Sequence, residues 1–102
     1  MIRLLVRIIG SNAESGREST LAHVEADRFD PEFLGDQIAI ALDHAIAYAS
    51  GGDDEALRVW NPEVSISLTA DNEEIRPSLH LTPALLLRLA RAGAALDFDP
   101  YV

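Results

Sequence analysis

The fold is decided most clearly by the stretch LTPALLLRLARAGAALDFDPYV, which runs from Leu81 to Val102. Thr82 can cap a helix that begins with Pro83, and Gly93 suits the left-handed residue that ends one. Arginines near the carboxyl end of this segment complement the helix dipole. The three- and four-residue spacing of its apolar side chains predicts one buried stripe, formed by Leu85, Leu86, Leu89 and Ala92.

The chain then alternates apolar and acidic residues, which predicts a short final strand. Leu96 and Phe98 are expected to point toward the core. Asp97 and Asp99 then point the other way, and Pro100 ends the strand. Two carboxylates about 7 Å apart on one strand face suit either a divalent cation or an acid/base pair. An edge strand whose charges prevent pairing with another sheet is the simpler interpretation, and we favour it.

The amino-terminal part predicts a hairpin. Ile2–Ile9 has one wholly apolar face and one mixed face, a pattern typical of a strand that is central in its sheet. The polar segment Gly10–Glu18 is expected to turn the chain, and Ser19–Ala26 is the second strand. A hairpin between the two runs follows, although its long loop leaves the register open.

A helix is expected next, over Pro31–Ala49. Asp30 is suited to cap it, and Pro31 to occupy its first turn. Ser50-Gly51-Gly52 is expected to stop it. Its many alanines predict that it lies close against a sheet.

The middle of the chain predicts a second hairpin. Ala56–Trp60 is interpreted as a short strand interrupted by Asn61-Pro62. Val64–Ala70 is expected to turn one apolar face to the core and one hydroxyl face to solvent. The turn Asp71–Glu74 would lead into a returning strand, Ile75–Leu81, in which a proline favours an edge or a bulge. The order β-β-α-(β)-β-β-α-β indicates an α+β two-layer sandwich with one antiparallel or mixed sheet and two helices.

Length and charge narrow the function classes. We expect residues 1–102 to form a single globular domain. The 17 acidic residues outnumber eight basic ones, all arginine, to give a net charge of −9, which disfavours binding to nucleic acid. With no cysteine, disulfides and thiolate chemistry are excluded. We expect no membrane-spanning segment and no signal peptide, hence a soluble cytoplasmic protein. Its rich Arg and Ala content is typical of a bacterial source.

No motif indicates catalysis. The three histidines, His23, His44 and His80, lack the spacing of a metal site, and no glycine-rich phosphate loop or nucleophile elbow is present. We therefore expect neither a cofactor nor a resident metal, and a protein that is not an enzyme.

The candidate partner-binding residues are Asp53, Asp54, Glu55 and Trp60. The three acids are expected in an exposed loop, where they either solubilise the protein or steer a basic partner toward it. Trp60, the only tryptophan, either packs in the core or anchors a partner, because tryptophan is enriched at binding hot spots.

The capped helix LTPALLLRLARAG followed by AALDFDPYV resembles the closing element of small bacterial α+β domains that include immunity proteins of polymorphic-toxin systems. This resemblance covers only the last part of the chain. It implies a non-enzymatic protein that binds and neutralises a toxin, and it assigns no contact residue.

Our leading hypothesis is a small acidic protein-binding domain, specifically an immunity-type inhibitor of a bacterial toxin that carries a basic surface. One alternative is a phage-type nucleic-acid mimic that blocks a DNA-binding protein through a continuous acidic stripe. Another is a metal-dependent enzyme that uses Asp97 and Asp99. Self-association into a homo-oligomer also stays open.

Overall fold

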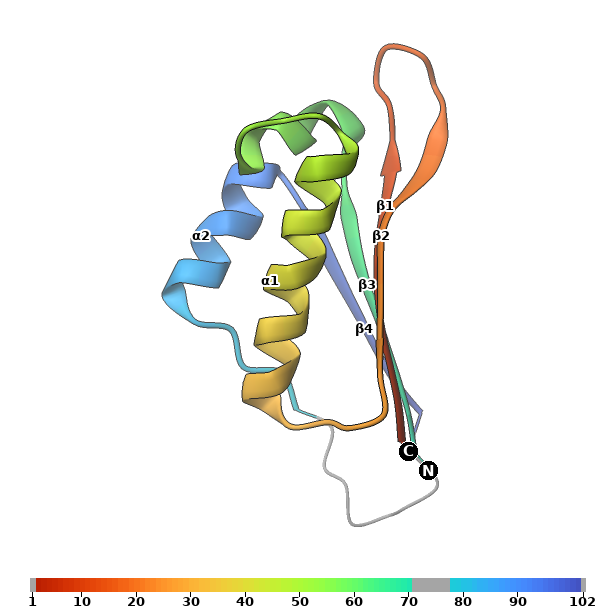
Figure 1. Cartoon of the computed structure of the whole chain (residues 1–102), viewed down its shortest axis with the longest axis vertical. Coiled ribbons are helices and arrows are strands. Elements are labelled where there is room, and N and C mark those ends of the chain that lie inside the picture. Colours follow the sequence, from red (N-terminus) through yellow and green to blue (C-terminus); the bar gives the residue numbers. More distant parts are fainter. Residues whose placement is uncertain (1, 71–77, 102) are drawn as a thin grey trace.

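A computed structural model describes residues 2–70 and 78–101, and it shows one sheet with the helices on one side of it (Figure 1). The elements follow one another along the chain as β1 (Ile2–Ser11), β2 (Glu18–Ala26), α1 (Pro31–Tyr48), the 3₁₀ helix η1 (Asp54–Trp60), β3 (Glu63–Ala70), α2 (Pro83–Ala92) and β4 (Ala95–Tyr101).

The sheet is mixed, with the strand order β2-β1-β3-β4. β1 pairs antiparallel with both β2 and β3, whereas β3 and β4 run parallel. The predicted fold class, an α+β sandwich with an antiparallel or mixed sheet, is confirmed, and so is the central position of β1. β1 and β2 form the predicted amino-terminal hairpin, whose register shifts at a bulge between Ile8 and Ile9.

Side-chain hydrogen bonds cap the amino-terminal ends of both α-helices. The Asp30 carboxylate accepts a hydrogen bond of 2.8 Å from the backbone N–H of Phe33, and the Thr82 hydroxyl accepts one of 3.2 Å from Leu85. Gly93 ends α2 in the left-handed conformation, as predicted, with φ of 64°. α1 ends at the predicted Ser50-Gly51-Gly52 stop, where Ser50 adopts the left-handed conformation, with φ of 55°.

One apolar core lies between the helices and the sheet. Alternate residues of β1 and β3 face it, and both helices and η1 cover it, so that each element turns its apolar side inward. The fully buried large side chains include Leu4, Ile8, Leu34, Ile38, Leu42, Leu57 and Ile66.

The prediction of a strand at Ala56–Trp60 is wrong, because this segment belongs to η1. Asp53 caps the turn by accepting a hydrogen bond from the backbone N–H of Ala56, at 3.3 Å. Leu57 is buried and Trp60 is half-buried. Residues three apart share one side of a 3₁₀ helix, so this spacing turns both side chains toward the core without a strand.

The second predicted hairpin is also corrected. Its turn and the residues up to Pro77 lie outside the described part of the chain, while the segment from Ser78 to Leu81 is not a strand. Both sides of β3 are occupied, by β1 along one side and by β4 along the other. β3 therefore continues through α2 into a parallel strand, and no edge is left for the predicted return.

Two smaller predictions at the carboxyl end are wrong. Leu86 is 50% exposed and not buried, because α2 turns Leu85 and Leu89 inward and leaves Leu86 on its outer side. β4 does not end at Pro100, since Pro100 lies opposite Leu68 and the strand continues to Tyr101. Asp97 and Asp99 are exposed on this edge strand.

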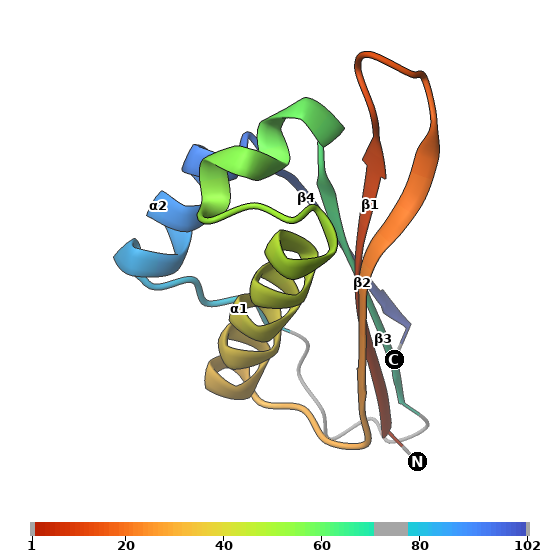
Figure 2. The same cartoon turned by 45° about the horizontal axis from the view of Figure 1, so that its top comes forward.

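The two faces of the sheet are covered differently. α1, η1 and α2 lie over one face, and no described element lies over the other (Figures 1 and 2). None of the described helices is both long enough and apolar enough to span a membrane.

Candidate functional site

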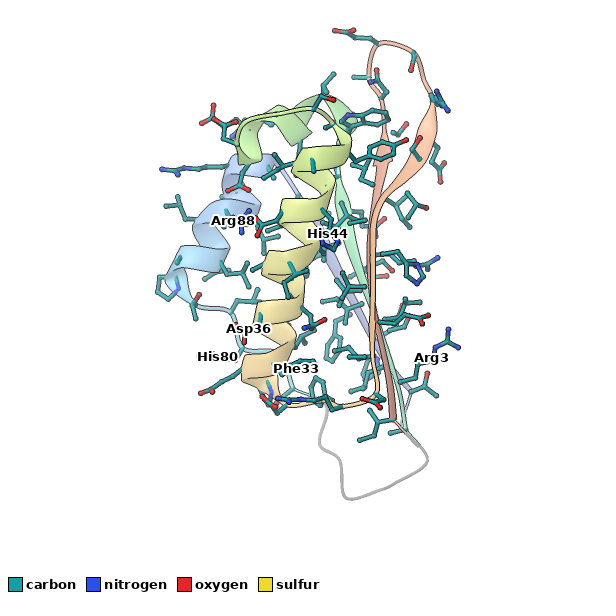
Figure 3. All side chains as sticks on the ribbon, in the orientation of Figure 1. Arg3, Phe33, Asp36, His44, His80 and Arg88 are labelled. Atoms are coloured by element: carbon teal, nitrogen blue, oxygen red, sulfur yellow. The ribbon has the colours of Figure 1, made fainter. Side chains whose placement is uncertain are left out.

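A cleft of about 430 Å³ opens between the two α-helices. Residues on α1 form one wall, and α2 with the segment before it forms the other. Figure 3 shows Asp36, His80 and Arg88 from these two sides. The lining residues are Glu32, Gly35, Asp36, Ala39, His80, Thr82, Ala84, Leu85 and Arg88.

The floor of the cleft is kept open by Gly35, which lies near the amino-terminal end of α1. A side-chain carbon on Gly35 would lie 3.8 Å from the backbone oxygen of His80 and 3.9 Å from a methyl carbon of Leu85. Those are ordinary contact distances, so a methyl group would fit but would take up space in the cleft. Glycine within a helix costs stability relative to alanine, and here the missing side chain leaves room between α1 and α2.

Carboxylates lie at the rim of the cleft. Glu32 and Asp36 are exposed and one helical turn apart on α1, so both side chains project from the same side of the helix. Ala39 and Leu85 contribute apolar surface beside them. The cleft thus combines an apolar floor with negative charge at its entrance.

Arg88 closes one end of the cleft and links three elements. Its Nε donates to Asp54 Oδ1 and Oδ2 at 3.1 and 3.0 Å, and its Nη2 donates to Asp54 Oδ1 at 2.9 Å and to Asp43 Oδ1 at 2.8 Å. The pKa of Arg88 is raised, chiefly because the Asp54 carboxylate accepts these bonds, although partial burial acts the other way. This cation is therefore balanced within the fold.

The acids predicted to bind a partner occupy different environments. Asp53 is exposed and caps η1, and Glu55 is exposed beside it. Asp54 is only 9% exposed and is held by Arg88. The structure therefore does not bring the three acids together as one steering surface, because Asp54 acts inside the fold.

Trp60 is the last residue of η1 and does not line the cleft. It is half-buried and meets Tyr48 edge to face, with the ring centroids 6.2 Å apart. A side-chain carbon on Gly10 would lie 2.9 Å from the Cβ of Trp60, so the glycine allows β1 to pass close to η1. Trp60 therefore packs against the hydrophobic core.

Sequence reasoning missed the cleft, although a signal was present. Glu32, Asp36 and Asp43 are spaced by four and seven residues, which places three acids on one side of α1. The residues on the opposite wall come from a segment about fifty positions later in the chain, and only the packing of α2 brings them near.

The described residues offer no metal site. Among residues 2–70 and 78–101, no three histidine or carboxylate side chains come together in a group able to hold a metal ion. No buried side-chain nitrogen or oxygen in this part of the chain lacks a hydrogen-bond partner.

Comparison with known proteins adds no relative. No family model, no curated protein and no solved structure matches this chain.

Proposed function

We propose that this protein is a non-catalytic protein-binding domain that receives a basic segment of its partner in the cleft between α1 and α2. The observation that carries this proposal is the combination of an apolar floor, kept open at Gly35, with the exposed carboxylates of Glu32 and Asp36 at the rim.

The chemistry of the cleft matches a lysine or arginine side chain. These side chains have an aliphatic stem and a charged head. The stem would lie on the surface of Ala39 and Leu85, while the head would reach the carboxylates at the entrance. A volume of about 430 Å³ holds one or two such side chains and not a folded domain.

Electrostatics favour the same class of partner. The only arginine that lines the described cleft, Arg88, already has its charge balanced by Asp54 and Asp43. The rim therefore stays negative, and the chain as a whole carries −9. Such a field accelerates association with a basic surface and becomes weaker as salt is added.

The test is affinity capture from an extract of the cells that encode the protein, followed by binding measurements with the captured partner. The variant Glu32→Gln/Asp36→Asn removes both rim charges. The control Glu14→Gln/Glu18→Gln removes two exposed charges at the amino-terminal hairpin. We expect the cleft variant to bind at least about tenfold more weakly and the control to bind like the wild type. Equal weakening of both variants, or no captured partner, would contradict the proposal.

Within this class, we propose an immunity-type inhibitor that acts on a toxin in the cytoplasm. The resemblance of Leu81–Val102 to the closing element of such domains supports this narrower reading. Co-expression with the product of the neighbouring gene tests it. Growth should be restored by the wild type and by the hairpin control, and not by Glu32→Gln/Asp36→Asn. If the neighbouring product is not toxic, the narrower proposal fails while the general one stands.

A further inference from the structure

The hydrogen-bond acceptors of the cleft are spread over both of its walls. Glu32 and Asp36 lie one turn apart on the same side of α1 and both line the cleft, so two carboxylates face one space. His80 belongs to the opposite wall, and Figure 3 shows it together with Asp36. Because Gly35 has no side chain, the backbone oxygen of His80 stays within reach: a carbon there would lie 3.8 Å from it. A cation that enters the cleft therefore meets acceptors in more than one direction.

Acceptors in several directions suit a guanidinium better than an ammonium group. A guanidinium has five N–H donors in a planar fork, whereas an ammonium group is a compact point charge with three donors. Arg88 shows the same use of a guanidinium inside this chain. Its Nη2 alone donates to Asp54 at 2.9 Å and to Asp43 at 2.8 Å, and these two carboxylates come from different elements.

We propose that the cleft selects an arginine side chain of the partner over a lysine side chain. This inference rests on the proposed function, and it names the residue that the same cleft receives. The guanidinium would bridge the carboxylates of Glu32 and Asp36 and turn a further N–H toward the backbone oxygen of His80. Its stem would lie on Ala39 and Leu85.

The apolar surface of the cleft favours arginine for a second reason. A guanidinium is more weakly hydrated than an ammonium group, and its flat face packs on other side chains. Bringing it against Ala39 and Leu85 therefore costs less hydration free energy. A lysine head would stay in water at the entrance and would gain mainly from the charge of the rim.

The resident arginine leaves room for an incoming one. Arg88 bonds to Asp43, which lies two helical turns beyond Asp36 on α1, or about 10 Å along the helix axis. Figure 3 shows Arg88 farther along the helices than Asp36 and His80. That separation exceeds the Debye length of about 8 Å at 0.15 M salt, and the charge of Arg88 is already balanced. Repulsion between the two guanidinium groups is therefore weak.

NMR titrations with three short peptides test this selection. The probes are blocked alanine tripeptides whose central residue is arginine, lysine or citrulline, which keeps the shape of arginine without its charge. We expect the arginine peptide to bind with a dissociation constant of about 1 mM and to shift the amide signals of Gly35, Ala39 and Ala84. It should bind at least about fivefold more tightly than the lysine peptide. The citrulline peptide should bind most weakly, because it lacks the charge.

One variant asks whether both carboxylates take part. Asp36→Asn leaves a single carboxylate at the rim, so the preference for arginine over lysine should fall below about twofold. The control Glu14→Gln removes an exposed charge from the turn of the amino-terminal hairpin and should keep the full preference.

The outcomes separate this inference from the proposed function. If the arginine and lysine peptides bind equally well at the cleft, or if the preference survives in Asp36→Asn, the selection of arginine is wrong and the proposed function stands. If neither basic peptide shifts the cleft signals, both are contradicted.

Discussion

At the scale of single residues, Arg88 decides how α2 is attached. Its guanidinium reaches Asp54 of η1 and Asp43 of α1. Removing one partner of a buried pair leaves the other charge without compensation. We expect Arg88→Met, which keeps most of the side-chain volume, to lower the free energy of unfolding by about 2–4 kcal/mol in urea titrations.

Two further variants separate the ion pair from packing. Asp43 lies at the exposed end of the network, so Asp43→Asn should cost less than about 1 kcal/mol. Arg88→Met combined with Asp54→Leu removes both charges and should recover most of the loss. If the double variant is as unstable as Arg88→Met alone, the side chain of Arg88 acts by packing and the charge argument is wrong.

A second residue-scale prediction concerns Glu25 on β2. The pKa of Glu25 is lowered, first because its carboxylate accepts a hydrogen bond of 2.7 Å from Arg3 and next because of its hydrogen bond with His23. A lowered pKa in the folded state stabilises the fold at pH values above the unfolded pKa. That contribution is lost as the pH falls through the folded pKa.

Carbon-detected NMR of the Glu25 carboxyl group measures this directly. In the wild type it should titrate below the usual glutamate pKa of 4.5. Arg3→Gln should move the pKa of Glu25 upward, toward that value, because the main hydrogen-bond donor is lost. Arg17→Gln, which removes a charge from the hairpin turn, is the control. An unchanged titration in Arg3→Gln would show that the ion pair does not persist in solution.

At the scale of elements, replacing each of two glycines by alanine should change the free energy of unfolding in opposite directions. Gly35 lies within α1 with space for a methyl group, so Gly35→Ala should stabilise the protein by about 0.5–1 kcal/mol. Gly93 ends α2 with φ of 64°. There Gly93→Ala should cost about 1–2 kcal/mol, because other residues rarely adopt that conformation.

Thermal unfolding of the two variants side by side checks this pair. Each replacement adds the same methyl group, so only the backbone environment differs. Gly35→Ala should also narrow the cleft and weaken partner binding although the fold is more stable, which separates function from stability. If Gly35→Ala instead destabilises the protein, α1 and α2 pack more closely in solution than they do in this structure.

At the scale of the whole molecule, charge opposes folding. A chain with −9 repels itself when compact. Because added salt screens this repulsion, we expect the unfolding temperature to rise by a few degrees between 0.01 and 0.5 M NaCl, as the Debye length falls from about 30 Å to a few ångström. Calorimetry measures it, with chloride used because sulfate stabilises proteins by exclusion. A fall with added salt would mean that the ion pairs of Arg3 and Arg88 outweigh the repulsion.

The local features of the fold could be predicted from sequence alone. Asp30 before Pro31 and Thr82 before Pro83 marked both helix starts, because capping and the fixed proline φ act within one turn. Gly93 marked the end of α2, because the left-handed conformation that favours glycine is also a local property of the backbone. The alternation in β1 and β3 identified the buried face of each strand, since the side-chain period of a strand does not depend on its neighbours.

The tertiary structure decided what lies next to what. Either Ile75–Leu81 or β4 could pair with the edge of β3 that β1 leaves free. The local sequence of neither segment determines which of them does. The role of Asp54 and the cleft at Gly35 depend in the same way on α2, which supplies Arg88 and the opposite wall. Propensity and capping are local interactions, whereas strand partners, buried ion pairs and clefts arise from contacts between segments far apart in the chain.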